Sequence, residues 1–387
     1  MKNTTFSRRR FASGVALAVG GLGLAAGREL LAQAANPSTM SPGARMSPEQ
    51  YDAVVKLCFN ENPYGPSAAV LQAMNGAFKY SNRYGYPDGG LIRAIAEHHG
   101  VKPENVLLGA GSTEVLCIAG DTFLAEGRKV IGAEPTFDGV YQHATGLKAD
   151  AIRVPLRADF QQDIPSMIQA AKDHAREIGL IYLCNPNNPT GAIVTKDEIK
   201  QLLDGVPENI PVLIDEAYHH FVENPNYGTS THYVLEGRPV LVTRTFSKIA
   251  ALAGMRLGYG LAPAKLIEQM RPYSDSMCVN ALAKYAGDTS LKDTAGQEKV
   301  RSEIIGTRRK TTAELESIGY KVIPSEANFF MVDIRRNVQP VIEAFREQGI
   351  LVGRPFPPMV QHLRVSVGTP GEMDRFMGAF KSIFATG

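Results

Sequence analysis

Short apolar runs alternate with amphipathic stretches along most of the chain. Six runs have the length and the aliphatic or β-branched content of buried strands: NVLLGA, KVIGAE, AIRVPL, GLIYLCN, VLIDE and VLVTRT. Between them, stretches such as GLIRAIAEHHG and IPSMIQAAKDHAREIG space their apolar residues as a helix does. This alternation predicts an α/β fold, in which helices cover both faces of a mostly parallel sheet.

The pattern changes near Cys278, where a smaller α+β domain is expected. A long helical segment, GQEKVRSEIIGTRRKTTAELESIG, precedes YKVIP, NFFMVDI, a second helix VQPVIEAFREQG, ILVG and LRVSVG. Near the other end, prolines and a glycine leave little room for regular structure over residues 35–56. We therefore expect an N-terminal arm over 35–66, a large domain over 67–277 and a small domain over 278–387.

Residues 1–34 have the pattern of an export signal. A basic start precedes an uncharged run over Ala12–Ala26, and Ala32-Gln33-Ala34 fits a cleavage site. The run falls short of the about 20 apolar residues that cross a bilayer, so we expect no stable membrane insertion. The stretch Ser7–Phe11 resembles a twin-arginine signal, which would make the twin-arginine export machinery a partner and the protein periplasmic. A plain Sec signal and an uncleaved anchor are the alternatives.

Charge and cysteine content exclude several classes of protein. The signal carries five basic residues and one acidic residue, so its removal lowers the formal net charge from +2 to −2. Without a basic patch, we expect no nucleic-acid partner. Four widely scattered cysteines lack zinc spacing, and two of them lie in apolar runs, so we predict neither a disulfide nor a metal site. The neighbouring His219 and His220 are interpreted as structural.

Polar residues follow four of the predicted strands at the points where they end. The turn GAGSTE follows the first strand, NPNNPTG follows GLIYLC, Asp215 ends VLID, and Ser247 and Lys248 follow VLVTRT. Because the carboxyl ends of parallel strands meet at one edge of a sheet, we expect these residues to lie close together.

Each of these features alone has an ordinary explanation. The GAGSTE turn fits phosphate at a helix N-terminus, but Glu114 stands where a dinucleotide motif has its third glycine. Asp215 could cap a helix, Asn188 could serve a turn and Lys248 could lie on the surface. Together, a lysine, an anion and a phosphate site are what pyridoxal phosphate requires. The combination predicts that cofactor, with Lys248 bonded to its aldehyde.

Several motifs resemble those of class I/II aminotransferases of fold type I, in particular the histidinol-phosphate aminotransferase subgroup. They are SKIAALAGMRLGY, NPNNPTG, DEAYHHF, NENPYGPS and LRVSVGT, and the resemblance spans roughly residues 56–384. It implies a large cofactor domain with a seven-stranded, mostly parallel sheet, a small C-terminal domain and a homodimer with shared active sites. It also implies ping-pong transfer of an amino group between an L-amino acid, or a histidinol-phosphate-like amine, and a 2-oxo acid.

The resemblance assigns roles to individual residues. Lys248 would bond to the cofactor and then act as the base at the substrate α-carbon, and Asp215 would pair with the ring nitrogen. The phenolic oxygen would accept hydrogen bonds from Asn188 and Tyr218, and Phe137 would stack on the ring. The phosphate would be held by the backbone of Ser112 and Thr113 and by Thr245, Ser247 and Arg256.

Further residues are assigned to the substrate and to the dimer. Arg364 would hold the substrate carboxylate with Asn328 close by, and Tyr64 and Arg354 would be additional substrate contacts. In NRYGYPD, Tyr86 is the residue expected to reach the phosphate in the neighbouring subunit, with Tyr84 as the alternative.

The substrate stays open at this point. An export signal argues against an intermediate of histidine biosynthesis, and Phe137, Tyr64 and Phe356 favour an aromatic or otherwise bulky free amino acid. A decarboxylase or another lyase would keep Lys248 and Asp215 and is the alternative enzyme. A non-catalytic binding protein is the remaining alternative.

Overall fold

The computed structural model describes residues 46–84, 90–124, 127–275 and 277–385. It divides the chain into two units, Met1–Asp52 and Ala53–Gly387. Of the first unit the structure describes residues 46–52, most of helix α2 (Pro48–Ala53). The export signal and Tyr86 lie outside the described residues. None of the described helices combines the length and the apolar character that a membrane span requires.

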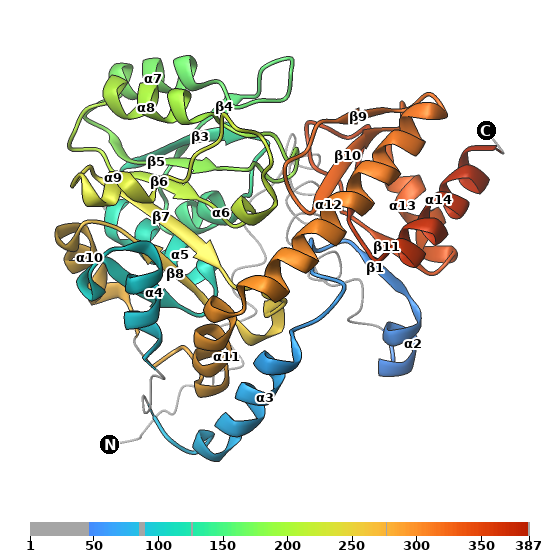
Figure 1. Ribbon diagram of the computed structural model, residues 1–387. Helices are drawn as coiled ribbons and strands as arrows, with labels where there is room; N and C mark the ends of the chain where they lie inside the picture. The colour runs from blue at the N-terminus through green and yellow to red at the C-terminus, as the bar shows by residue number, and fades with distance from the viewer. Residues whose placement is uncertain (1–45, 85–89, 125–126, 276, 386–387) are drawn as a thin grey trace, which may run out of the picture. The chain divides into compact units, whose positions relative to one another are not determined.

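The larger sheet of the second unit has seven strands in the order β2-β8-β7-β6-β5-β3-β4 (Figure 1). Parallel pairing joins β7, β6, β5, β3 and β4, whereas β8 runs antiparallel to both β2 and β7. The strand bounds are β2 (Val106–Gly109), β3 (Lys129–Glu134), β4 (Ala151–Pro155), β5 (Ile178–Cys184), β6 (Val212–Asp215), β7 (Val240–Thr245) and β8 (Gly258–Leu261). The expected α/β fold with a mostly parallel seven-stranded sheet is confirmed.

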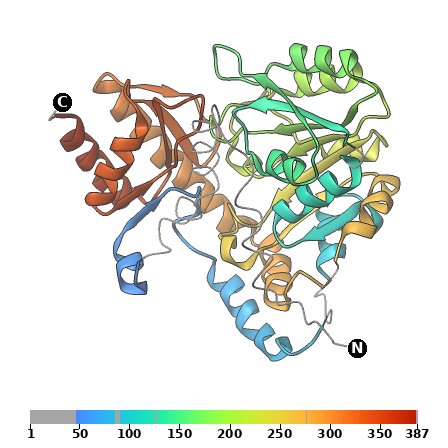
Figure 2. The same ribbon diagram turned by 180° about the vertical axis from the view of Figure 1, so that it is seen from behind.

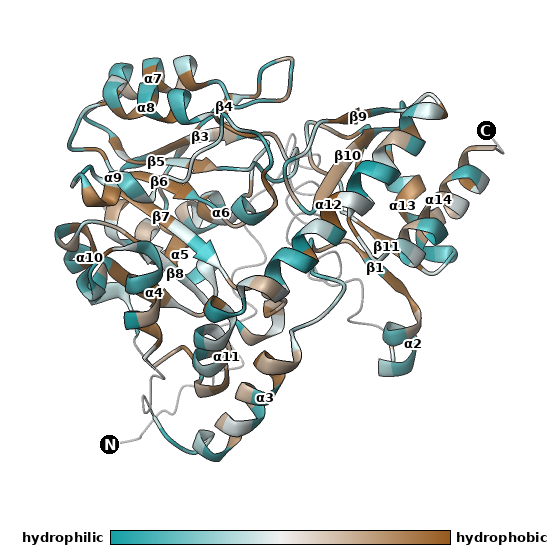
Figure 3. Cartoon of the chain, viewed as in Figure 1, coloured by the Kyte–Doolittle hydropathy of each residue, from teal (hydrophilic) through white to brown (hydrophobic). Residues whose placement is uncertain are grey.

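Helices cover both faces of this sheet. On one face, α4 (Leu91–His99), α7 (Ile164–Asp173), α8 (Lys196–Gly205) and α9 (Thr231–Leu235) contribute to one apolar cluster. On the other face, α5 (Ser112–Phe123), α6 (Gly139–Gly146) and α10 (Ala264–Met270) contribute to a second cluster, and α5 and α6 lie in front of the sheet in Figure 2. Apolar residues concentrate on the strands (Figure 3). Burial on both faces explains why the strand sequences read as continuous apolar runs.

Strand β8 is one element that the apolar pattern does not reveal. Its sequence, GYGL, is half glycine, and both glycines meet close neighbours. A Cβ on Gly258 would lie 2.2 Å from the backbone nitrogen of Ser112, and one on Gly260 would lie 2.9 Å from the Leu241 side chain. The glycines therefore let β8 pass close to the start of α5, at the expense of strand propensity.

The C-terminal part of the unit contains two small sheets. An antiparallel sheet has the order β12-β10-β9, from β9 (Lys321–Ile323), β10 (Phe329–Asp333) and β12 (His362–Ser366). A parallel pair joins β1 (Val55–Leu57) to β11 (Ile350–Val352). Helices α12 (Thr294–Ser317), α13 (Val338–Glu347) and α14 (Pro370–Ala385) pack with these strands around a core rich in phenylalanine.

The N-terminal stretch over 35–56 differs from the expectation of little regular structure. It contains α2 and most of β1, whose Val55 and Leu57 are buried in the core of the C-terminal part. A three-residue strand paired with a partner almost 300 residues away leaves no local periodicity to find.

Helix packing across the predicted boundary at residue 278 is continuous. Helix α11 (Ala281–Lys292) packs against α3 (Ala68–Ala77), and its Ala283 and Ala286 belong to the cluster that covers the large sheet. The domain limits at residues 66 and 277 remain predictions.

Candidate active site

The predicted polar residues come together because three parallel strands end in register. Cys184 at the end of β5 pairs with Asp215 at the end of β6, which pairs with Thr243 near the end of β7. The turns that follow these strands carry Asn188 and Lys248. The strand register thus brings an amide, a carboxylate and an amine to one edge of the sheet.

Asp215 is a buried carboxylate without a basic partner in contact. Its side chain accepts a hydrogen bond from the hydroxyl of Thr243 at 3.2 Å, and it takes part in no salt bridge among the described residues. Burial raises the pKa of Asp215 to about 6, against the lowering effect of that hydrogen bond. A cation placed beside this carboxylate would therefore be stabilised strongly.

Lys248 follows β7 and points into the same region. Its Nζ donates to the carbonyl of Phe59 at 3.0 Å and lies 5.7 Å from the centre of the Tyr218 ring. Burial, followed by the positive charge of Arg364, lowers the pKa of Lys248 to about 8. The lowered pKa increases the fraction of neutral amine near neutral pH, and the neutral amine is the form that a nucleophile or a general base needs.

A cradle for an anion lies at the start of α5. Gly111, at φ 80°, precedes the helix, and a Cβ there would lie 2.1 Å from Nη2 of Arg256. The Arg256 backbone is itself left-handed, and its Nη1 lies 3.5 Å from the hydroxyl of Ser247. Thr245 donates to the same hydroxyl at 2.8 Å.

The first turn of α5 completes this cradle. The backbone N–H groups of Ser112 and Thr113 belong to that turn, where a helix has no internal acceptors for them. Hydroxyls, a guanidinium and free N–H groups at a helix N-terminus suit a phosphate dianion. Together with Asp215 and Lys248, these residues fit pyridoxal phosphate.

Arg364 on β12 has a buried guanidinium in which one nitrogen has no hydrogen-bond partner. It donates to Oδ1 of Asn188 at 2.7 Å and to the carbonyl of Cys58, whereas its Nε has no partner. Burial lowers the pKa of Arg364 to about 10. Asn328 donates to the carbonyl of Asn60 at 2.9 Å, and its buried Oδ1 also has no partner. Buried polar atoms usually have partners, so an unpaired donor and an unpaired acceptor in this region are candidates for ligand contacts.

Tyr218 is held by its neighbours in this region. The hydroxyl of Tyr218 accepts from the side chain of Asn60 at 3.1 Å, and its ring packs edge-on against Phe329 at 5.0 Å. Burial raises the pKa of Tyr218 well above its usual value, so the hydroxyl stays protonated and can donate.

The other predicted residues are more exposed. Phe137 is half-buried against the second core cluster, and Tyr64 places its hydroxyl 3.5 Å from a carboxylate oxygen of Glu303. Arg354 forms a salt bridge with Asp138, with 3.2 Å between Nη2 and Oδ2. Tyr84 is 89% exposed.

Asn60 is a neighbour of the site that the sequence did not single out. Its side chain bonds Tyr218 and Ser366, and its carbonyl accepts from Asn328. It lies in the NENPYGPS motif and has φ 55°, a conformation that asparagine tolerates better than most residues. The motif signalled the position, but only the contacts show its use.

A buried ion pair was also missed. Arg244 on β7 and Glu216 after β6 are joined at 2.7 Å and are almost fully buried. An arginine inside the apolar run VLVTRT was the available signal, since a buried charge needs a partner. The rings of His219 and His220 have their centres 3.7 Å apart and are tilted by 40°, and burial together with Arg244 lowers the pKa of both. No metal-binding group of side chains occurs among the described residues.

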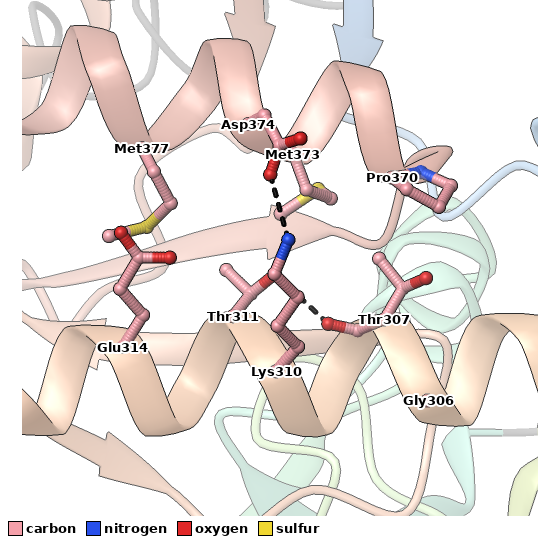
Figure 4. Close-up of a pocket in the computed structure, with 9 residues that line it drawn as sticks. All are labelled: Gly306, Thr307, Lys310, Thr311, Glu314, Pro370, Met373, Asp374 and Met377. Atoms are coloured by element: carbon pink, nitrogen blue, oxygen red, sulfur yellow. Dashed lines mark hydrogen bonds and ion pairs between the residues drawn. The ribbon is translucent and has the colours of Figure 1, made fainter.

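A separate hollow of about 100 Å³ lies between α12 and α14 (Figure 4). Lys310 and Asp374 form a salt bridge of 3.0 Å across it, and Glu314 and Met377 lie at one end. Its lining includes none of the predicted site residues. We therefore place the chemistry at the strand ends and not in this hollow.

Comparison with known proteins agrees with this site. The family model "Aminotransferase class I and II" matches residues 52–380. A histidinol-phosphate aminotransferase from Moorella thermoacetica is 38% identical over 339 residues, which is 86% of each chain. An aromatic amino acid aminotransferase from Rhodococcus jostii is 34% identical over 334 residues, 85% of this chain and 90% of the relative.

A solved structure supports the fold. The histidinol-phosphate aminotransferase from Sinorhizobium meliloti, in complex with pyridoxal 5'-phosphate, has a TM-score of 0.81 at 23% identity and covers 90% of this chain and 99% of that chain. The four cysteines of the present chain, Cys58, Cys117, Cys184 and Cys278, are free. The chain belongs to the class I and II aminotransferases, which are transferases of amino groups with pyridoxal phosphate as cofactor.

Proposed function

We propose that the protein transfers the amino group of a free L-amino acid with an aromatic or otherwise bulky side chain to a 2-oxo acid, in ping-pong order. The observation that carries this proposal is the guanidinium of Arg364, which is buried and keeps an unpartnered Nε. A substrate carboxylate supplies the missing acceptor and can receive two donors in a fork. The ring of Phe356, 4.6 Å from this guanidinium, gives the neighbouring space an aromatic wall.

The cofactor-binding residues follow from the geometry of the strand ends. When bound, pyridoxal phosphate supplies an aldehyde that bonds to amines and a ring that accepts electrons. Asp215 would lie beside the ring nitrogen and hold a proton there, because a buried carboxylate without a cation stabilises a positive partner. The cradle at α5 would hold the phosphate, and Tyr218 and Asn188 would orient the ring by hydrogen bonds.

Lys248 has the properties needed for proton transfer. Its lowered pKa keeps part of the amine neutral at the pH of the reaction, so Nζ can take and hold the proton of the substrate α-carbon. The carbonyl of Phe59 accepts a hydrogen bond from Nζ and holds the amine in place. Phe137 would pack against one face of the ring.

The resemblance of the motifs also supports a homodimer with shared sites. In this arrangement Tyr86, or Tyr84, contributes a hydroxyl to the phosphate of the neighbouring subunit. Light scattering of the purified protein should give twice the mass of one chain, and a monomer with full activity would contradict the proposal.

We further propose that the protein is exported to the periplasm by the twin-arginine route. The proposal rests on Ser7–Phe11 and on the apolar run that follows. Replacement of Arg8 and Arg9 by lysine should keep the protein in the cytoplasm. Unchanged export of this variant would favour a Sec signal, and retention in the membrane would favour an uncleaved anchor.

Histidinol phosphate is the second candidate substrate, because the Moorella relative carries that name at 38% identity. The decisive experiment is a panel of amino donors and 2-oxo acid acceptors, with the purified exported protein and added pyridoxal phosphate. We expect oxo acids from phenylalanine, tyrosine or a similar donor. A panel in which only histidinol phosphate reacts would overturn the proposed substrate. Release of carbon dioxide in place of an oxo acid would favour a decarboxylase.

A further inference from the structure

Arg354, at the end of β11, is already paired with a carboxylate of its own chain. Its Nη2 lies 3.2 Å from Oδ2 of Asp138, and its Nη1 donates to the carbonyl of Pro355 at 3.0 Å. The same oxygen of Asp138 accepts from the side chain of Gln142 at 2.9 Å. The carboxylate is therefore held in place from two directions, and one face of the guanidinium is occupied.

Arg354 lies beside the arginine that is proposed to bind the substrate. The guanidinium carbons of Arg354 and Arg364 lie 4.4 Å and 4.6 Å from the centre of the same Phe356 ring. Arg354 is also one of the groups whose charge lowers the pKa of Arg364. Both arginines thus contact the same aromatic ring, and they are close enough for the charge of one to act on the other.

The number of cationic side chains without a carboxylate partner decides which acid group of a substrate the site can balance. A carboxylate carries one negative charge and is matched by the fork of Arg364. A phosphate monoester carries close to two negative charges at neutral pH and needs a second cation. Besides Lys248, Arg354 is a further cation whose charge acts on Arg364, and Asp138 neutralises it. The other carboxylate nearby, Glu303, faces Tyr64 and adds negative charge.

The carboxylate of Asp138 does not cap helix α6, although its position would suit that role. Asp138 precedes the first residue of α6, where an aspartate commonly caps the helix, but its side chain makes no capping hydrogen bond. It is directed instead to Gln142 and Arg354.

We propose that Asp138 is a specificity-determining residue, which pairs with Arg354 and so adapts the site to the single charge of an α-carboxylate and against a phosphate ester in the same place. This inference rests on the proposed function and deepens it. It uses repulsion against the wrong substrate as well as attraction to the right one. Because the pair is half-exposed, solvent screens the effect, and we expect discrimination of about fivefold to tenfold.

L-Histidine and L-histidinol phosphate form a matched pair of substrates, since they share the imidazole side chain and the α-amino group and differ in the acid group. We would measure kcat/KM for both with wild-type protein and with Asp138→Asn. The variant should raise the ratio of phosphate ester to carboxylate by about fivefold or more, chiefly through KM, and the rise should shrink at high salt.

Two controls separate charge from shape. Asp121→Asn removes a carboxylate of similar exposure, which is bonded to His143 on α6, and should leave the ratio unchanged. In an Arg354→Gln background, Asp138→Asn should no longer raise the ratio, because the cation that it would release is gone.

Three results are distinguishable. A ratio that changes by less than twofold, or that rises equally without Arg354, would overturn the role of Asp138. A rise that depends on Arg354 would support it. A wild-type protein that converts only the phosphate ester would contradict the proposed substrate, and kcat/KM of Asp138→Asn for the phosphate ester alone would still report whether the pair disfavours phosphate.

Discussion

Asp215 and Glu216 are neighbours in the chain, and both carboxylates are buried at the end of β6, yet their surroundings differ completely. Glu216 accepts from Nη2 and Nε of Arg244 and from the backbone N–H of Ser230. Asp215 accepts from the Thr243 hydroxyl and has no cation in contact among the described residues. The neighbouring strand β7 repeats this difference, with Thr243 beside Asp215 and Arg244 beside Glu216.

Burial alone does not mark a functional carboxylate. The charges of Glu216 and Arg244 balance each other, so neither side chain needs a ligand as a partner. The carboxylate of Asp215 has lost water without gaining a counter-charge, and its raised pKa is the consequence. A positively charged ligand nitrogen would complete it, which is why Asp215 and not Glu216 belongs to the cofactor site.

The largest effect is expected for Lys248→Ala, in the region where Asp215 has no counter-charge. Loss of the base and of the covalent attachment should lower kcat by about 10³-fold or more, whereas the folded protein should remain intact. Steady-state rates with a reactive donor measure this, and circular dichroism with thermal unfolding checks the fold. Turnover within tenfold of wild type would contradict the role of Lys248.

Disruption of the ion pair between Glu216 and Arg244 should lower the free energy of unfolding. Glu216→Ala leaves the guanidinium of Arg244 buried and unpaired, which should cost about 3–5 kcal/mol of unfolding free energy. Urea unfolding of the cofactor-free protein measures it. The double variant Glu216→Ala/Arg244→Ala should lose less than the sum of the two single variants. If Glu216→Ala cost less than about 1 kcal/mol, the pair would not be the stabilising unit described here.

Asp215→Asn should stabilise the cofactor-free protein at neutral pH. Because the pKa of Asp215 is raised from 3.8 to about 6 in the folded protein, the protonated carboxyl favours folding at low pH. That advantage is lost as the pH rises from about 4 through about 6. The unfolding free energy of the cofactor-free variant should therefore match wild type near pH 4 and exceed it by roughly 1–3 kcal/mol at pH 7.

The bound cofactor should reverse this order, since the neutral amide of the Asp215→Asn variant cannot balance a protonated ring nitrogen. Unfolding at pH 4, 6 and 7 with and without pyridoxal phosphate tests both statements. A variant that is less stable than wild type at pH 7 without cofactor would show that Asp215 is already balanced in the protein.

The smallest effect is expected for Thr243→Val, which removes the hydroxyl that donates to Asp215. One hydrogen bond to a charged group contributes about 1.5–3 kcal/mol, so the pKa of Asp215 should rise further and activity should fall several-fold. The acid limb of the pH–rate profile should move to higher pH. Thr245→Val, which also removes a hydroxyl from β7, should instead weaken cofactor binding. An acid limb that stays at the same pH in Thr243→Val would contradict a role of this hydrogen bond in the reaction.

The sequence predicted the layered fold because parallel strands buried on both faces leave long apolar runs. It predicted the candidate residues at the strand ends because Lys248, Asp215 and Asn188 lie in local motifs. It did not reveal β8, whose glycines suit close packing against α5, or β1, which is three residues long and pairs with a distant strand. Such features depend on contacts between segments far apart in the chain.

The same limit applies to the pairs that tune the site. Arg354 was predicted as a substrate contact, but its partner Asp138, more than 200 residues away in the chain, was not predicted. The sequence shows Glu216 and Arg244 as charged residues in apolar surroundings. Only the register of β6 and β7 shows that they form a pair. Local motifs thus indicate the reacting groups, and the three-dimensional structure shows which charges are balanced.

The most direct test of the central claim is the chemical identity of the cofactor-bearing residue. Protein loaded with pyridoxal phosphate would be reduced with borohydride, digested and mapped by mass spectrometry. We expect the reduced cofactor on the peptide that contains Lys248, and no such label in Lys248→Ala. A label on a different lysine, or no label on a protein that still transfers amino groups, would contradict the account.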